Sequence, residues 1–218
     1  MNFKRMIALS GILFLVFILF TGMVLFVDVQ PIGPDGSSVG LAMINQAFAK
    51  QVGVHLLWYQ ITDWLGLVAI GVALGFAVLG LVQLLTRKSI KKVDSQIIVL
   101  GVFYGLVVLI YAFFEIIIVN YRPILMDGML EASYPSSHTI LVLCIMSTAL
   151  TMFDYLLSRK KMLRHILSAA AIIIMAVTVL GRLICGVHWL TDIIAGIILS
   201  AALVALFYAF IQLMKTQK

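Results

Sequence analysis

Six long apolar stretches are the feature that most restricts what this 218-residue chain can fold into. Most of them approach the roughly 20 residues that a helix needs to cross the hydrocarbon core of a bilayer. Only 11% of the residues are charged and 63% are hydrophobic, which is typical of an integral membrane protein and not of a soluble domain. The stretches cover residues 6–27, 65–85, 97–119, 139–157, 166–180 and 193–214.

These stretches predict an all-α membrane protein, with six transmembrane helices in a single domain that spans residues 1–218. A helix satisfies its backbone hydrogen bonds internally, and the alternating pattern of a barrel strand is absent. The fifth stretch is short, but apolar residues resume after it, so we expect its helix to continue past Arg182. The first stretch is too long for a signal peptide and no small-residue cleavage site follows it, so we expect a retained helix.

The basic residues are distributed unevenly among the connections, and this distribution predicts the orientation. Only Lys50, Arg122 and Arg182 fall in the connections 28–64, 120–138 and 181–192 or at their edges, and the other 12 of the 15 lie on the opposite side. Because Lys and Arg are retained on the cytoplasmic side, both termini are predicted to be cytoplasmic. The net charge of +6 is then explained by loops near anionic lipid, without a nucleic acid partner.

A histidine and a carboxylate dominate the last outer connection. His188 and Asp192 are four residues apart, a spacing that on a helix places both side chains on one face. Arg182 lies six residues before His188. An oriented imidazole beside a guanidinium group predicts chemistry on an anion.

The preceding outer connection carries further polar residues. Arg122 follows the third apolar stretch, and Pro135-Ser-Ser-His138 opens the fourth. Ser136 or Ser137 is expected to cap that helix, and free N–H groups at a helix start also bind phosphate oxygens. We therefore expect the outer surface to bring together this helix start with Arg122, Arg182, His138, His188 and Asp192.

These residues resemble, in order and internal spacing, the three signature motifs of the type 2 phosphatidic acid phosphatase superfamily. The family motifs run K-x6-R-P, P-S-G-H and S-R-x5-H-x3-D. Their counterparts here are Arg122-Pro123, the segment 135–138, and Arg182-x5-His188-x3-Asp192, all within residues 115–192. The six-helix layout is also similar to that of the membrane branch of the family.

The resemblance implies roles for three of these side chains. The histidine matching His188 attacks phosphorus to form a phosphohistidine, and the carboxylate matching Asp192 orients it. The histidine matching His138 protonates the leaving oxygen and then activates water. The implied reaction uses no metal ion and no cofactor, and the histidines and carboxylates lack a compact metal-ligand signature such as H-E-x-x-H. The phosphate oxygens would be held by backbone N–H groups and by Arg122, Arg182, Ser136 and Ser137.

Three positions depart from the family motifs. Glu115 stands where the first motif has lysine, Ser137 replaces the glycine of the second, and Gly181 replaces the serine of the third. An ionisable residue in a membrane segment is a functional candidate, so Glu115 is expected to pair with Arg122 or Arg182, or to serve a substrate group other than phosphate. It is a possible specificity residue.

The first outer segment, residues 40–64, mixes apolar and polar side chains and includes Trp58 and Trp64. Because Trp and Tyr concentrate at the membrane interface, we expect one or two helices lying in the outer headgroup layer. Our hypothesis is that this segment helps to form a side door for a lipid phosphate. Asp127 and Glu131 are expected to be solvated loop charges.

The leading function predicted from the sequence is a lipid phosphatase facing outward from a bacterial cytoplasmic membrane. Its substrate would be a phosphate or diphosphate monoester, such as phosphatidic acid, phosphatidylglycerol phosphate or undecaprenyl diphosphate. Two alternatives remain: a lipid phosphotransferase, and a non-enzymatic transporter or scaffold that retains the fold. The identity of the lipid and the oligomeric state stay open at this point.

Overall fold

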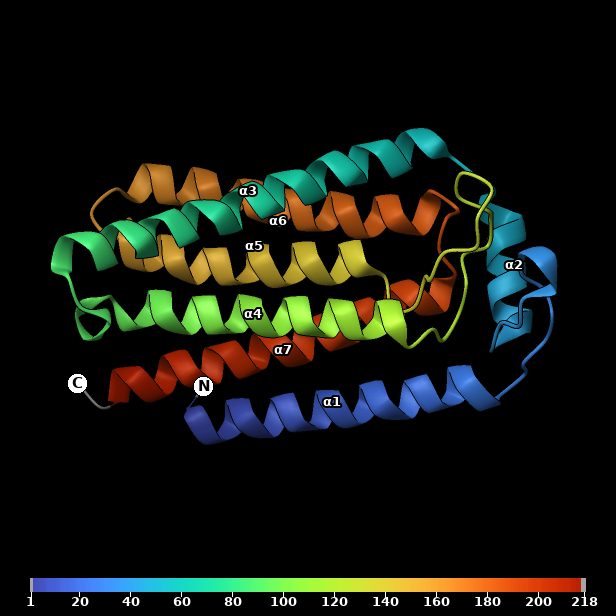
Figure 1. Cartoon of the computed structure of the whole chain (residues 1–218), viewed down its shortest axis with the longest axis horizontal. Helices are drawn as coiled ribbons and strands as arrows, with labels where there is room; N and C mark the ends of the chain where they lie inside the picture. Colours follow the sequence, from blue (N-terminus) through green and yellow to red (C-terminus); the bar gives the residue numbers. More distant parts are fainter. Residues whose placement is uncertain (1, 217–218) are drawn as a thin grey trace.

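Six long helices and one short helix build the part of the chain that the computed structural model describes, residues 2–216 (Figure 1). All but α2 are long and apolar enough to cross a membrane, so the predicted all-α fold with six such helices is confirmed, and the chain is a multi-pass membrane protein. Two single turns of 3-10 helix, Pro34–Gly36 and Ile90–Lys92, lie in the connections. The helices are α1 (Phe3–Phe26), α2 (Ala42–Val52), α3 (Leu56–Arg87), α4 (Ser95–Ile116), α5 (Ser137–Leu156), α6 (Lys161–Ile184) and α7 (Leu190–Thr216).

Helices α5 and α7 form the centre of the bundle. In the most apolar 18-residue stretch of each of these two helices, 50% and 56% of the residues are buried. The corresponding fraction in the other four long helices is 17 to 22%. Helix α1 packs along α7, whereas α3 and α6 pack against α5, and α4 contacts both central helices. The outward faces remain apolar, with Ile18 of α1 and Val102 of α4 well exposed, as expected for helices that lipid surrounds.

The connections are sorted between the two ends of the bundle (Figure 1). Helix α2 and the α4–α5 and α6–α7 connections lie at one end, on the right of the view. Both ends of the described chain and the α3–α4 and α5–α6 connections lie at the other. This grouping agrees with the predicted alternation of connections, while the side that faces the cytoplasm remains a prediction from the basic residues.

The segment of residues 40–64 differs in part from the prediction. Helix α2 supplies one of the expected short helices, but residues 56–64 are the first turns of α3, so the expected start of that helix at residue 65 is wrong. Polar side chains such as Gln60 and Asp63 interrupt the apolar run without breaking the helix. At 1.5 Å per residue the 32 residues of α3 extend about 48 Å, beyond the roughly 30 Å hydrocarbon core. Asp63 therefore belongs to a membrane helix.

Helix α2 is fastened to the start of α7 through one buried amide. Asn45 donates from Nδ2 to the Thr191 hydroxyl at 3.0 Å, and the Thr191 N–H donates to Asn45 Oδ1 at 3.2 Å. Neighbouring Met43 and Ile44 are exposed, so α2 turns its apolar face outward. The two amide contacts fix the first turn of α7, which carries Asp192.

Candidate active site

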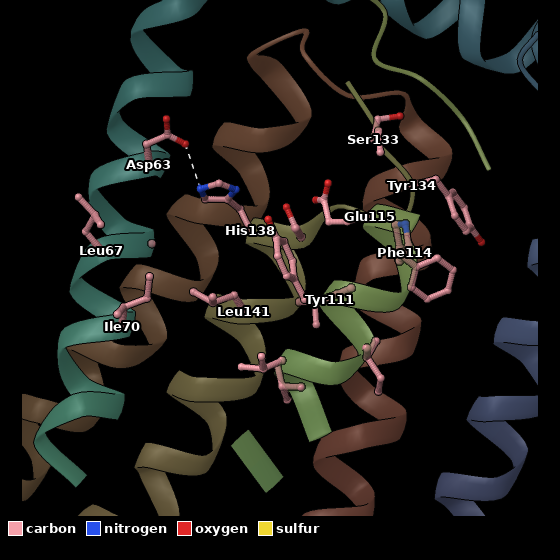
Figure 2. Close-up of a pocket in the computed structure, with 18 residues that line it drawn as sticks. Asp63, Leu67, Ile70, Tyr111, Phe114, Glu115, Ser133, Tyr134, His138 and Leu141 are labelled. Carbon is pink, nitrogen blue, oxygen red and sulfur yellow. Dashed lines mark ion pairs between the residues drawn. The ribbon is translucent and has the colours of Figure 1, made fainter. Parts of the chain in front are cut away.

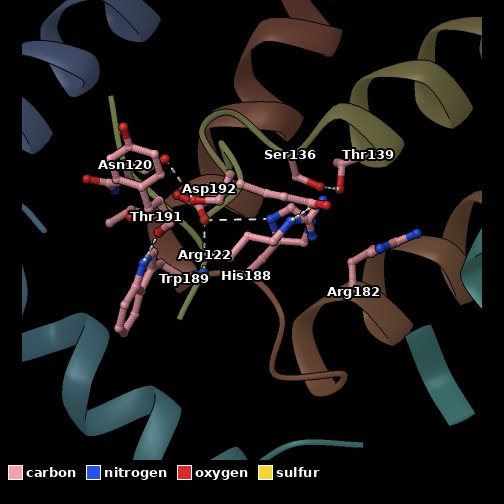
Figure 3. Close-up of polar contacts among 12 residues, drawn as sticks. Asn120, Arg122, Ser136, Thr139, Arg182, His188, Trp189, Thr191 and Asp192 are labelled. Atoms are coloured by element: carbon pink, nitrogen blue, oxygen red, sulfur yellow. Dashed lines mark hydrogen bonds and ion pairs between the residues drawn. The ribbon is translucent and has the colours of Figure 1, made fainter. Parts of the chain in front are cut away.

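The third motif forms a buried histidine and carboxylate pair at the start of α7 (Figure 3). His188 Nδ1 lies 3.6 Å from Asp192 Oδ2, and both side chains are almost fully buried. The expectation that both lie on one helix face is wrong, because His188 precedes α7 and only Asp192 belongs to it. They meet because Asp192 Oδ2 accepts the Trp189 N–H at 2.9 Å, which folds the connection back over the helix start.

Arg122 determines which nitrogen of His188 carries the proton. Its Nη1 lies 3.4 Å from His188 Nε2, and a guanidinium group only donates, so Nε2 presents its lone pair and Nδ1–H faces Asp192. Burial, followed by the nearby charges of Arg122 and Arg182, lowers the pKa of His188 well below its usual range. His188 is therefore a neutral imidazole at neutral pH.

Arg122 and Arg182 are both held by carboxylates, but not by Glu115, the carboxylate that was expected. Arg122 Nε pairs with Glu131 at 3.0 Å, and Arg182 Nη2 pairs with Asp63. No ion pair of Glu115 occurs among the described residues, so its expected pairing with an arginine is not found. Glu131, expected to be a solvated loop charge, is 44% exposed and also pairs with Arg122.

Arg182 retains unused donors. Its side chain is fully buried and its Cζ lies 4.8 Å from the centre of the Tyr59 ring. Nε and Nη1 are buried without a hydrogen-bond partner among the described residues. Buried donors of this kind are costly unless an acceptor fills the space, so they provide two positions for the oxygens of an anion.

Ser136 links the start of α5 to the start of α7. It occupies the N-cap position of α5, but its hydroxyl makes no capping bond and instead accepts from the Thr139 hydroxyl at 3.0 Å. The expected side-chain cap is therefore wrong for Ser136. Its backbone N–H donates to the Asp192 carbonyl at 3.0 Å, which brings the second motif against the third. Ser137 is the first residue of α5, and it lines a cavity between α3, α4 and α5.

A cavity of about 330 Å³ opens beside His138 between α3, α4 and α5 (Figure 2). His138 Nε2 lies 3.0 Å from Asp63 Oδ1 on one side, and Glu115 and Tyr111 line the cavity on the other. Asp63 was not among the residues expected here. Most of the remaining lining is apolar, including Leu67, Ile70, Val107, Phe114, Ile140 and Leu141.

Metal ligands are not grouped in this region. Within the described part of the chain, no three His, Cys, Asp or Glu side chains are placed to hold one metal ion. Cys144 and Cys185 are both buried and free.

Gly181, where the third motif has serine, packs directly against α3. A Cβ added there would lie 2.5 Å from Thr62 Cγ2 and 3.2 Å from Trp58 Cε3. Thr62 is buried and its hydroxyl bonds to two carbonyls of its own helix, so it cannot easily turn away.

We expect Gly181→Ser to lower the free energy of unfolding by about 1–3 kcal/mol, measured as the melting temperature of the detergent-solubilised protein.

The control is Gly71→Ser, also on a membrane helix, where an added Cβ meets nothing within 4 Å. The double substitution Gly181→Ser with Thr62→Ser removes the obstructing methyl and should regain part of the lost stability. An unchanged melting temperature in Gly181→Ser alone would contradict the steric explanation.

Comparison with known proteins identifies the part of the chain that carries these site residues. The model of the PAP2 superfamily matches residues 113–215, which include His138, His188 and Asp192. The fold is similar to the crystal structure of the first transmembrane PAP2 type phosphatidylglycerolphosphate phosphatase from Bacillus subtilis, with a TM-score of 0.64, 19% sequence identity, and coverage of 93% of this chain and 96% of that chain. No curated protein matches the sequence. With its three motifs gathered at one end of a six-helix bundle, the chain carries a PAP2 superfamily region over residues 113–215.

Proposed function

We propose that this chain is a membrane lipid phosphatase that hydrolyses a phosphate ester through a phosphohistidine formed on His188. The observation that carries the proposal is the geometry of His188: a buried imidazole whose Nδ1 lies 3.6 Å from Asp192 Oδ2 and whose Nε2 lies 3.4 Å from Arg122 Nη1. A nucleophile oriented by a carboxylate and aimed at a guanidinium group is suited to attack on a bound phosphate.

In the first step, His188 Nε2 attacks phosphorus while the bond to the lipid oxygen breaks. The electron pair of that bond leaves on the lipid oxygen, and His138 supplies the proton that yields a neutral alcohol. Asp192 stabilises the positive charge that develops on the His188 ring. Arg122 and the free donors of Arg182 bind the phosphate oxygens, whose negative charge is redistributed in the transition state.

In the second step, water attacks the phosphohistidine. His138, neutral after the first step, accepts the proton of the water. The P–N bond then breaks, its electron pair returns to His188 Nε2, and inorganic phosphate leaves. The donors around Arg122, Arg182, Ser136 and Ser137 would serve both steps.

A lipid substrate is supported by the cavity beside His138. Its apolar lining between α3, α4 and α5 suits the beginning of a hydrocarbon chain, and it adjoins helices whose outer faces are apolar. A lipid that enters sideways from the bilayer would bring its phosphate to His188 from this direction. The excess of basic residues in the other connections supports an active site facing outward from the cytoplasmic membrane.

Glu115 is proposed as a specificity residue because it lines the same cavity as His138 and is not ion-paired among the described residues. A carboxylate there disfavours a leaving group with its own negative charge, such as the second phosphate of a diphosphate.

We expect Glu115→Gln to raise the rate on a prenyl diphosphate relative to phosphatidic acid by about 3–10-fold, since roughly 1 kcal/mol of repulsion is removed. The readout is the ratio of kcat/KM values, with Asp127→Gln as the control; an unchanged ratio would remove Glu115 from substrate selection.

The test of the function is phosphate release by purified protein in detergent with a chelator present. The substrates are phosphatidic acid, phosphatidylglycerol phosphate, undecaprenyl diphosphate and a soluble sugar phosphate. Release from a lipid but much less from the sugar phosphate is expected. Equal turnover of the sugar phosphate would refute the entry of the substrate sideways from the bilayer. Phosphate release only when an acceptor lipid is added would indicate a phosphotransferase. No reaction with any lipid would favour a scaffold or transporter.

A further inference from the structure

Asp63 joins two groups of the candidate site that are far apart in the sequence. It lies on α3, and its Oδ1 contacts both Arg182 Nη2 from α6 and His138 Nε2, the latter at 3.0 Å, from α5. Arg182 is fully buried, while the Asp63 side chain is 36% exposed where it borders the cavity. One carboxylate oxygen of Asp63 therefore connects Arg182, proposed to bind the phosphate, with His138, proposed to transfer the proton.

The same face of α3 is shaped to receive the His138 ring. Gly66 follows Asp63 by three residues, and a Cβ added to it would lie 3.0 Å from His138 Cδ2 and 3.5 Å from Nε2. The absence of a side chain at Gly66 lets the ring lie close to the helix with Nε2 directed at Asp63 (Figure 2).

This contact fixes the roles of the two nitrogens of His138. A carboxylate accepts hydrogen bonds, so Nε2 carries the proton that Asp63 accepts. Nδ1 is buried and has no partner among the described residues. It is therefore the nitrogen left to give a proton to the lipid oxygen or to take one from water.

We propose that Asp63 is a positioning residue for the proton transfer of His138, an inference that rests on the function proposed above. Its carboxylate holds the ring with Nδ1 toward the reacting oxygen and stabilises the imidazolium form that donates the proton. The site then contains two histidine and carboxylate pairs that use opposite nitrogens. His188 faces Asp192 with Nδ1 and reacts with Nε2, whereas His138 faces Asp63 with Nε2 and reacts with Nδ1.

The experiment compares two substrates that have the same hydrocarbon chain and differ in the leaving group. One is an alkyl phosphate, whose alkoxide must be protonated as it leaves. The other is a nitrophenyl phosphate bearing that chain, whose phenolate leaves without a proton. Asp63→Asn is expected to lower kcat/KM by about 30–100-fold for the alkyl phosphate and by less than about 5-fold for the nitrophenyl phosphate. The parameter kcat/KM is used because it reports the step that forms the phosphohistidine.

A role of Asp63 in phosphate binding through Arg182, or in folding alone, would lower both values equally, and that result would overturn the proposal. Because Asp63→Asn leaves a buried arginine without its counter-ion, Asp63→Glu is tested in parallel. It keeps the charge but displaces the oxygen from His138, so the same dependence on the leaving group is expected.

Asp154→Asn is the matched control, since Asp154 also pairs with an arginine, Arg164, at 3.5 Å but does not line this cavity. It should leave both kcat/KM values unchanged. Failure of the wild-type protein to cleave either substrate would refute the proposed function itself, which distinguishes that failure from an equal loss in the Asp63 variants.

Discussion

Replacement of His188 by alanine is expected to lower phosphate release by at least about 10³-fold, the scale seen when a catalytic nucleophile is removed. No other neutral imidazole in the site has its lone pair directed at a guanidinium group, since His138 is turned toward Asp63. In the variant, water would have to attack the lipid phosphate directly, and only the remaining hydrogen-bond donors of the site would stabilise that transition state. The measurement is kcat/KM on the best lipid substrate, together with detection of acid-labile phosphate on the protein.

His165→Ala is the control for this substitution, because His165 is an exposed histidine on α6 and lies outside the candidate site. It should keep wild-type activity. A His188→Ala protein that keeps its melting temperature and more than a tenth of the wild-type rate would show that His188 is not the nucleophile.

The fold was largely predictable because lipid leaves the backbone few choices. A chain that must bury its N–H and C=O groups inside a bilayer forms helices, so the apolar runs predicted six of them. The error at α3 has the same physical origin. Residues 56–64 contain polar side chains that end an apolar run but not a helix, since the first turns can extend beyond the hydrocarbon core.

The site was predictable where its residues are close in sequence. Arg182, His188 and Asp192 lie within eleven residues, and the turn around Trp189 brings two of them into contact. Asp63 was missed because it is 119 residues from Arg182 and was assigned to an outer connection. A usable signal was present, since Asp63 is the single acidic residue of α3, and an ionisable residue in a membrane helix is a functional candidate.

The loop partner of Arg122 was also beyond prediction. Glu131 reaches Arg122 because the α4–α5 connection folds back on itself, with the Arg122 N–H donating to the Glu131 carbonyl at 3.0 Å. Backbone pairing of this kind in an irregular connection leaves no periodic pattern in the sequence. Glu115, which the motif spacing indicated, lines the cavity instead of pairing with an arginine.

Substitution of Arg182 by lysine is expected to lower kcat/KM by about 10²–10³-fold although the charge is kept, which is the scale for loss of an oriented transition-state donor. The nitrogens of the guanidinium group make different contacts: Nη2 contacts Asp63, whereas Nε and Nη1 have no hydrogen-bond partner within residues 2–216. The group also lies near the Tyr59 ring. A lysine carries all its donors on one atom and cannot serve Asp63 and a phosphate in the same fixed geometry.

Because lysine preserves the charge near His188, a loss in Arg182→Lys would report the geometry of the donors and not the electrostatic field. Arg164→Lys is the matched control, since Arg164 pairs with the mostly exposed Asp154 and should tolerate the exchange. The two variants are compared by kcat/KM on the same lipid, with melting temperatures recorded for both. If Arg182→Lys stays within about 5-fold of the wild type, a point charge is sufficient at this position, and the free guanidinium nitrogens do not bind the phosphate.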